Sequence, residues 1–208
     1  MNLAQDLAAG LTELGIAVPE AGQARLVQFV GLIEKWNKVH NLTAIRDPQQ
    51  MIAQHLLDSL AVLPYLGAAR SLLDVGSGAG LPGIPLALAS RGLTVTLLDS
   101  SHKRYAFQQQ CKAELGLGNV TAIHSRVQTY RNESGFDVVI SRAFSDLGEF
   151  IQAARHLAAK DGRLLAMKGL YPHEEIDKLP MGAEVARVTE LNIPGLDVTR
   201  HLLEIRVN

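Results

Sequence analysis

The chain has almost no cysteine, no long apolar run and no excess of charge of one sign, and each shortage excludes a class of protein. Its one cysteine, Cys111, cannot form a disulfide within the chain and suits a reducing compartment, so we expect it to pack inside a helix. No run of about 18 apolar residues predicts a membrane helix, and the N-terminus lacks the basic and apolar regions of a signal peptide. We therefore expect a soluble, cytoplasmic protein without membrane association.

The net charge and the spacing of metal-ligating residues limit the partners that the chain can bind. The formal net charge is −1, so contact with a nucleic acid would need a local cationic patch. Histidine and cysteine do not cluster at the spacing of a metal site, and we expect no metal. A length of 208 residues with 47% apolar content predicts one α/β domain with a modest extension.

Hydrophobic periodicity divides the chain into two regions. From residue 1 to residue 66 apolar side chains recur at helical spacing, which predicts a helical extension packed on the remainder. From 67 to 208 strand-like and helical segments alternate, which indicates crossover connections and a parallel sheet. Strands are predicted at 71–75, 94–98, 120–123, 136–140 and 163–167, helices at 82–90, 102–115 and 147–159, and a closing pair of strands at 185–191 and 200–207.

A glycine-rich turn after the first predicted strand is the most informative feature. The run Asp74-Val75-Gly76-Ser77-Gly78-Ala79-Gly80-Leu81-Pro82-Gly83 joins that strand to a helix. Glycine allows a sharp reversal at positive φ and lets a ligand approach the bare backbone. The second strand ends at Asp99, where a carboxylate can accept hydrogen bonds from both ribose hydroxyls of a nucleoside. The pairing predicts a nucleotide-like cofactor bound by Gly76, Gly78, Gly80 and Asp99.

The acid in front of the glycines favours one cofactor over another. The segment 78–83 matches the G-x-G-x-x-G pattern of NAD-binding proteins, which is a weak signal alone. Asp74 followed by Gly76-x-Gly78-x-Gly80 is instead the pattern of methyltransferases that use S-adenosylmethionine (SAM). SAM carries an ammonium group and no pyrophosphate, so an acidic residue beside the loop favours SAM. NAD, or a glycine-rich turn without a ligand, are the alternatives.

Several cations follow the predicted strands, at the edge where a parallel sheet binds ligands. They are Lys103, Arg104, Arg126, Arg142 and Lys168. Arg142 and Lys168 are our candidates for the catalytic role, since such side chains can donate to guanine O6 or hold phosphates. Val127 and Gln128 would lie against the adenine of a cofactor if the third strand neighbours the second. The alternative is an ordinary exposed loop.

The residues after the fourth strand bear on the atom that is methylated. Methyltransferases acting on exocyclic amines often have an Asn/Asp-Pro-Pro-aromatic run there, and this chain has Ser141-Arg142-Ala143-Phe144. A ring nitrogen such as guanine N7 has a lone pair and no proton to remove, so its methylation needs no general base. Catalysis would then depend on proximity and orientation.

These blocks resemble the bacterial guanine-N7 methyltransferases of small-subunit ribosomal RNA, also called the glucose-inhibited division protein B family. The resemblance covers nearly the whole chain. It is carried by Trp36-Asn37, Asn41-Leu42-Thr43, His55-Leu56-Leu57-Asp58-Ser59, Asp74 to Pro85, Leu98-Asp99-Ser100 with Lys103-Arg104, Ser141 to Phe144, and Lys168-Gly169.

The resemblance implies a class I, Rossmann-like fold with a seven-stranded, mostly parallel sheet and an N-terminal helical extension. It implies methylation of N7 of one guanine of 16S rRNA near the decoding region. We expect the substrate to be this RNA within the 30S subunit or a precursor, and we expect a monomer because nothing in the sequence demands more. The resemblance also implies SAM contacts at Gly76, Leu81, Val127, Gln128 and Arg142. The family usually has glutamate at position 128, whereas glutamine keeps an acceptor, adds a donor and loses the charge.

Three other functions are compatible with parts of the sequence. One is a methyltransferase for a small molecule or a protein, which would share the cofactor half. Another is a nicotinamide-dependent dehydrogenase. The third is a ribosome-assembly binding module with a vestigial pocket, against which the intact glycines argue.

Overall fold

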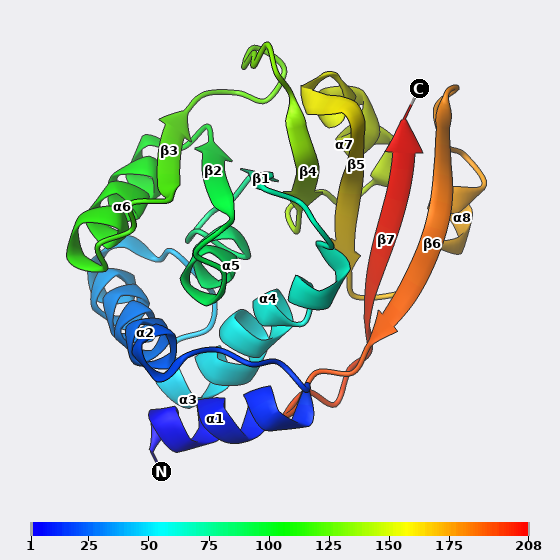
Figure 1. Ribbon diagram of the computed structural model, residues 1–208. Helices are drawn as coiled ribbons and strands as arrows, with labels where there is room; N and C mark the ends of the chain where they lie inside the picture. Colours follow the sequence, from blue (N-terminus) through cyan, green and yellow to red (C-terminus); the bar gives the residue numbers. More distant parts are fainter. Residues whose placement is uncertain (1, 208) are drawn as a thin grey trace.

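A seven-stranded sheet runs through the computed structural model, which describes residues 2–207 (Figure 1). The strand order is β3-β2-β1-β4-β5-β7-β6, parallel from β3 to β5, with β7 antiparallel to both β5 and β6. The bounds are β1 Ser71–Val75, β2 Thr94–Asp99, β3 Val120–His124, β4 Phe136–Ser141, β5 Ala158–Lys168, β6 Ala183–Leu191 and β7 Arg200–Val207. The predicted sheet and its closing antiparallel strands are confirmed.

Helices connect the strands and precede them. The N-terminal region contains α1 Leu3–Glu13, α2 Glu20–His40, α3 Pro48–Met51 and α4 Asp58–Leu60, with a π-helical turn Ile52–Leu57 between α3 and α4 and a 3-10 turn Leu63–Tyr65. The sheet region contains α5 Gly83–Ala89, α6 His102–Glu114, α7 Leu147–Ala154 and α8 His173–Ile176, with a 3-10 turn Arg155–Leu157. No helix within residues 2–207 is long and apolar enough to cross a membrane.

The two faces of the sheet bury separate apolar clusters because side chains alternate along each strand. In β1, Leu72 packs with α5, α6 and the N-terminal helices, whereas Leu73 and Val75 pack with α7. The first cluster is the larger of the two and includes Cys111, which is fully buried as predicted. In Figure 1 the N-terminal helices accordingly lie on the same side of the sheet as α5.

The N-terminal helices share their core with the sheet. Leu7, Phe29 and Leu56 are fully buried in the same cluster as Leu72 and Val95. Polar contacts add to this packing, since Trp36 Nε1 donates to Gln110 Oε1 of α6 at 2.8 Å. The N-terminal helices therefore pack against the sheet region, and a domain boundary at residue 66 stays a prediction.

The helix predicted at 147–159 is wrong at its C-terminal end. The chain leaves α7 at Ala154, and β5 begins at Ala158, which pairs with Phe136 of β4. The next pair is Val138 with Arg163, so the residues between the two pairs bulge out of the ladder. Pairing with β4 therefore overrides the helical pattern of the sequence.

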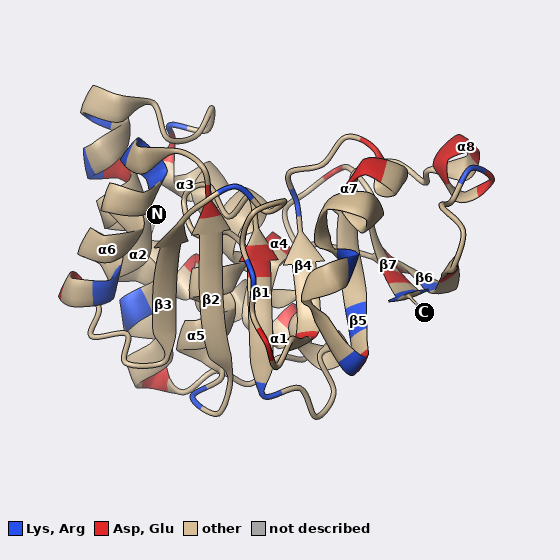
Figure 2. Ribbon diagram, turned by 90° about the horizontal axis from the view of Figure 1, so that it is seen from above, with Lys and Arg blue, Asp and Glu red and all other residues tan. Residues whose placement is uncertain are grey.

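Charged residues of both signs are interspersed over the molecule (Figure 2). This distribution matches the nearly neutral net charge. A nucleic acid would therefore be recognised by a local group of side chains and not by one basic face.

Candidate active site

Two pockets open near the carboxyl end of β4. The strand order reverses between β1 and β4, and open α/β sheets bind ligands at such a point. Ala143 and Phe144 line the first pocket, and Arg142 lines the second. The segment that follows β4 is therefore a wall of both pockets.

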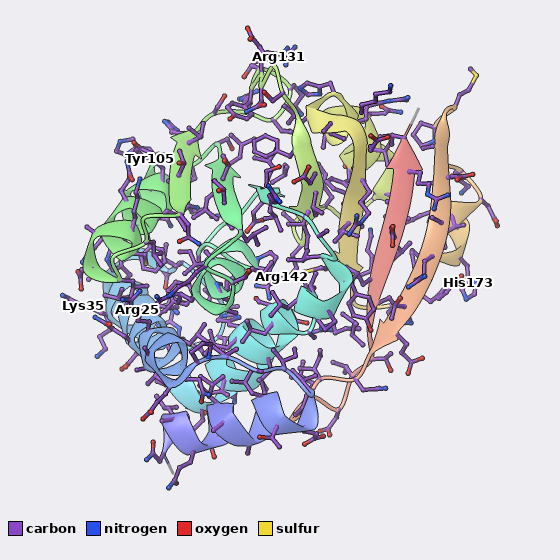
Figure 3. All side chains as sticks on the ribbon, viewed as in Figure 1. Arg25, Lys35, Tyr105, Arg131, Arg142 and His173 are labelled. Carbon is purple, nitrogen blue, oxygen red and sulfur yellow. The ribbon has the colours of Figure 1, made fainter. Side chains whose placement is uncertain are left out.

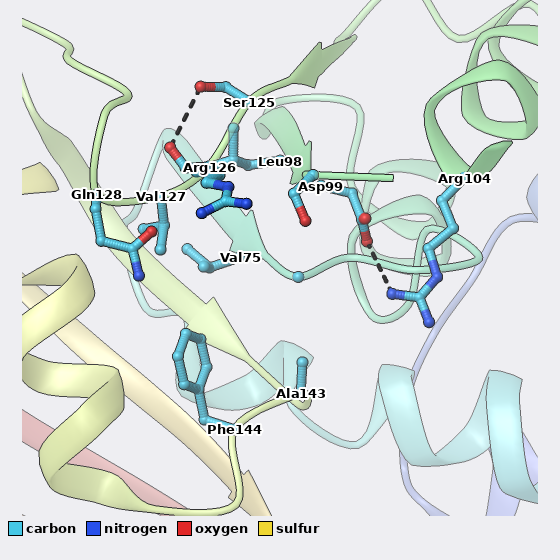
Figure 4. A pocket seen from close by; sticks show the side chains of 12 residues that line it. Val75, Leu98, Asp99, Arg104, Ser125, Arg126, Val127, Gln128, Ala143 and Phe144 are labelled. Atoms are coloured by element: carbon cyan, nitrogen blue, oxygen red, sulfur yellow. Dashed lines mark hydrogen bonds and ion pairs between the residues drawn. The ribbon is translucent and has the colours of Figure 1, made fainter. Parts of the chain in front are cut away.

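The first pocket has a volume of about 360 Å³, within the range of small-molecule sites. Its walls combine the apolar side chains of Val75, Leu98, Val127 and Phe144 with the carboxylate of Asp99 (Figure 4). The other lining residues are Gly76, Ser100, Arg104, Ser125, Arg126, Gln128 and Ala143. Of the residues predicted to bind the cofactor, the structure brings Gly76, Asp99, Val127 and Gln128 together here.

Asp99 lines the first pocket and also accepts hydrogen bonds from the backbone of the glycine-rich turn and of the residues that follow β2. Its Oδ2 accepts from the Gly78 N–H at 2.9 Å, and its Oδ1 accepts from the Ser101 N–H at 2.8 Å. Arg104 Nη1 lies 3.5 Å from Oδ2. A carboxylate has about four lone-pair sites, so capacity remains for hydroxyl donors from a ligand.

Gly76 is the glycine of the turn that borders the first pocket. Its φ is +69°, a backbone conformation that residues other than glycine rarely adopt. An added Cβ would lie 2.8 Å from Cβ of Ala143, so the backbone of β1 can approach the β4 segment only without a side chain. The bare backbone therefore keeps this end of the pocket open.

Gly78, Gly80 and Leu81 shape the turn and do not line the first pocket. The Gly78 N–H is engaged by Asp99, and Gly80 has φ +81° at a place where an added Cβ would collide with Cδ1 of Ile84. Leu81 is buried in the larger core cluster. Their direct contact with a cofactor stays a prediction.

Asp74 does not face the first pocket, although its charge was the reason to favour SAM. Alternation along β1 turns its side chain toward α5, where it is fully buried and Oδ2 accepts from the Gly83 N–H at 2.8 Å. Burial raises the pKa of Asp74 to about 7, and the Gly83 hydrogen bond offsets this only in part. The carboxyl group supports the helix that follows the turn.

The second pocket, of about 280 Å³, contains both predicted catalytic side chains, Arg142 and Lys168. Arg142 Nη1 pairs with Oδ2 of Asp58 at 2.8 Å and also donates to the Gln54 carbonyl at 3.2 Å. Figure 3 labels Arg142 near α4, and its side chain is 28% exposed to solvent. Its guanidinium is therefore fixed by the N-terminal helices.

Lys168 is held by three acceptors. Its Nζ lies 2.7 Å from Glu175 Oε2, 2.7 Å from the Ser145 carbonyl and 3.4 Å from the Phe144 carbonyl. An ammonium group has three donors, so these contacts engage all of them. They position the backbone of the segment after β4, and a direct catalytic role for Lys168 stays a prediction.

Sequence reasoning missed several polar residues of the second pocket, among them Asp58 and His55. Both are nearly buried; His55 lies in the π-helical turn Ile52–Leu57, and Asp58 follows that turn directly as the first residue of α4. π-Helical turns are rare and often occur at functional sites. The available signal was a histidine and an aspartate three residues apart in an otherwise apolar helical stretch. Within residues 2–207 no group of His, Cys, Asp or Glu could hold a metal.

The first pocket fits SAM in its size and its donor set. Apolar side chains suit an adenine ring, the Asp99 carboxylate suits ribose hydroxyls, and the bare backbone of Gly76 leaves space at the β1 end. The residues that would hold SAM are therefore Gly76, Asp99, Val127 and Gln128.

Solved structures share this architecture at low sequence identity. A SAM-dependent methyltransferase from Aquifex aeolicus aligns with a TM-score of 0.59 at 20% identity, covering 77% of this chain and 94% of that chain. A Burkholderia thailandensis 1,6-didemethyltoxoflavin-N1-methyltransferase solved with S-adenosylhomocysteine aligns with a TM-score of 0.59 at 14% identity, covering 87% and 89%. The architecture is the class I, Rossmann-like fold, with a pocket at its switch point.

The family follows from the sequence comparisons. The family described as rRNA small subunit methyltransferase G matches residues 22–203. A ribosomal RNA small subunit methyltransferase G from Nitrosospira multiformis is 53% identical over 99% of this chain and 98% of that protein. The chain belongs to the rRNA small subunit methyltransferase G family, as its sequence blocks suggested.

Proposed function

We propose that this protein methylates N7 of a guanine in small-subunit ribosomal RNA, with SAM as the methyl donor. The observation that carries the proposal is the match to the Nitrosospira multiformis enzyme along nearly the whole of both chains. The cationic second pocket beside the first supports it, because guanine O6 and phosphates are acceptors for arginine.

The chain's own residues would divide the work between the two pockets. Gly76, Asp99, Val127 and Gln128 hold the nucleoside half of the donor, and Arg142 orients the target base from the second pocket. When bound, SAM supplies a sulfonium methyl, which the N7 lone pair takes as the carbon–sulfur bond breaks and its electron pair goes to sulfur.

No proton leaves N7 in this reaction, so the residues serve to orient and not to deprotonate. Arg142 is suited to orienting because Asp58 and the Gln54 carbonyl hold its guanidinium in one place. Alignment of a nucleophile with a reactive carbon can supply several kcal/mol of a reaction barrier, roughly 7 or more in favourable cases.

We further propose that the substrate is the 16S rRNA within the 30S subunit or a precursor, and that the enzyme acts as a cytoplasmic monomer. Methyl transfer by one preparation of the enzyme to naked rRNA and to assembled particles distinguishes these two substrates.

The test is transfer of labelled methyl from SAM to 16S rRNA and to small subunits, both lacking the modification. We expect label in 7-methylguanosine after nuclease digestion, and SAM binding by calorimetry. Label in another nucleoside would overturn the N7 assignment, and no label in either RNA or subunits would overturn the proposal. Titration with NADH is the control for a dehydrogenase, and we expect no binding.

A further inference from the structure

Two buried polar side chains in the second pocket have atoms left without hydrogen bonds. Asp58 is 3% exposed to solvent in its side chain and His55 is 4% exposed. Within residues 2–207, neither Asp58 Oδ1 nor His55 Nε2 has a hydrogen-bond partner. Buried polar groups are almost always paired, so two such atoms lining one pocket indicate a ligand that supplies donors.

We propose that the second pocket receives the target guanine ring and that Asp58, with His55, selects guanine by its Watson–Crick edge. The inference rests on the proposed function and deepens it, because it names the residues that choose the base. Guanine presents two donors on this edge, N1–H and the N2 amino group, whereas adenine presents an acceptor at N1. A pocket with two acceptors therefore favours guanine and rejects adenine.

Asp58 is positioned to act as an acceptor and not only as an ion-pair partner. Arg142 engages its Oδ2 at 2.8 Å, whereas Oδ1 has an ion-pair partner but no hydrogen bond and keeps lone pairs for a ligand. Arg200 Nε from β7 lies 3.3 Å from Oδ1 as an ion-pair partner, so two positive charges flank the carboxylate. Two segments far apart in the sequence thus hold the carboxylate at the pocket, one at each oxygen.

His55 supplies the second acceptor. Its Nδ1 lies 3.1 Å from the Gln54 carbonyl, and a carbonyl requires a donor, so Nδ1 carries the proton and Nε2 accepts. Burial, followed by the positive charge of Arg142, lowers the pKa of His55 to about 4. The ring is therefore neutral near pH 7, and Nε2 keeps its lone pair.

The arrangement leaves the opposite edge of the base free for reaction. Guanine N7 lies on the Hoogsteen edge, away from N1 and N2, so holding the Watson–Crick edge does not cover the methylated atom. Enzymes that modify a base commonly read this edge in a pocket after the base leaves its stack.

The first experiment uses the wild-type protein saturated with S-adenosylhomocysteine, which occupies the first pocket. Binding of GMP, IMP and AMP is compared by NMR titration. The three share ribose and phosphate, so differences report on the base. We expect GMP to bind about tenfold more tightly than IMP, which lacks the N2 amino group, and more tightly still than AMP. Equal binding of the three would overturn the proposal.

The second experiment changes the acceptor. Asp58→Asn replaces a carboxylate by an amide of the same shape, and we expect the preference for GMP over AMP to shrink to about threefold or less. Methyl transfer to rRNA should fall at least about tenfold in kcat/KM, with SAM affinity unchanged. The matched control is Glu204→Gln, which also removes an acid paired with an arginine (Arg163, 3.5 Å) but lies outside both pockets.

The outcomes separate this inference from the proposed function. If the wild type methylates rRNA and Asp58→Asn changes neither rate nor base preference, the assignment of Asp58 fails while the function stands. If no rRNA is methylated but GMP is preferred and Asp58→Asn removes the preference, the function fails and the guanine pocket stands. Misfolding of Asp58→Asn would leave the wild-type nucleotide comparison as the decisive test.

Discussion

At the scale of single residues, Asp74 links the stability of the fold to pH. Its folded-state pKa of about 7 lies above the ordinary value of 3.8, so the folded protein binds a proton that the unfolded chain releases between these values. The free energy of unfolding therefore receives a contribution that decreases as pH rises from about 4 to about 7.

Asp74→Asn is expected to remove this dependence. The amide oxygen can still accept the Gly83 N–H, and no charge has to be buried. The variant should be more stable than the wild type at pH 8 by a few kcal/mol, on the order of 3, and nearly equal to it at pH 4. Urea denaturation at the two pH values measures these free energies of unfolding. The same difference between variant and wild type at pH 4 and at pH 8 would contradict the prediction.

Gly76 is a second residue whose chemistry can be tested alone. Gly76→Ala places a methyl group at φ +69° and 2.8 Å from Ala143, so we expect a loss of about 1–3 kcal/mol in stability and weaker SAM binding. Calorimetric titration and thermal denaturation provide the measurements. Gly92→Ala is the control, because nothing lies within 4 Å of its added Cβ and it lacks a positive φ. Equal behaviour of the two variants would refute the role of Gly76.

At the scale of elements, a side chain fastens the first strand to the fourth. Asp137 Oδ2 accepts from the backbone N–H groups of Arg70 at 2.8 Å and Ser71 at 2.9 Å, where β1 begins. These hydrogen bonds, that of Arg70 first, lower the pKa of Asp137 below its ordinary value of 3.8. The resulting stabilisation is present above about pH 4 and is lost as pH falls through the lowered pKa.

Asp137→Ala should therefore destabilise the protein by about 1 kcal/mol at pH 7, a modest value because the site is partly solvated. The difference from the wild type should shrink below about pH 4. Denaturant titrations across this range measure it. Glu184→Ala, which breaks the exposed pair with Arg206, is the control and should cost less than about 0.5 kcal/mol. A pH-independent difference would contradict the assignment.

Across the whole molecule, the extension and the sheet share one apolar core. The larger apolar cluster joins Leu7 and Phe29 of the extension to Leu72 and Val95 of the sheet. A fragment of residues 67–208 would expose the apolar residues of the sheet that these helices cover. We expect the fragment to lack a cooperative thermal transition, whereas the full chain has one. A cooperative melt of the fragment, with SAM binding intact, would show that 67–208 folds independently.

Prediction from the sequence succeeded where a pattern is local. The β7 bounds and the start of β1 follow from apolar runs bordered by polar turns, and the glycine turn follows from its own composition. Prediction failed where distant pairing intervenes. The end of α7 is set by the pairing of Ala158 with Phe136. The alternation of side chains along β1 could have predicted the face of the sheet on which Asp74 lies. The hydrogen bond between Asp74 and the Gly83 N–H could not be predicted from the sequence.

The sequence by itself determined the class of sheet, the cofactor turn and the family, because hydrophobic periodicity and the positions of glycines are local patterns that neighbouring residues define. Only the tertiary structure decided which side chains share a pocket. Asp58 comes from the helical extension, Arg142 follows β4 and Arg200 opens β7, and their charges meet because the buried Asp58 carboxylate requires positive partners.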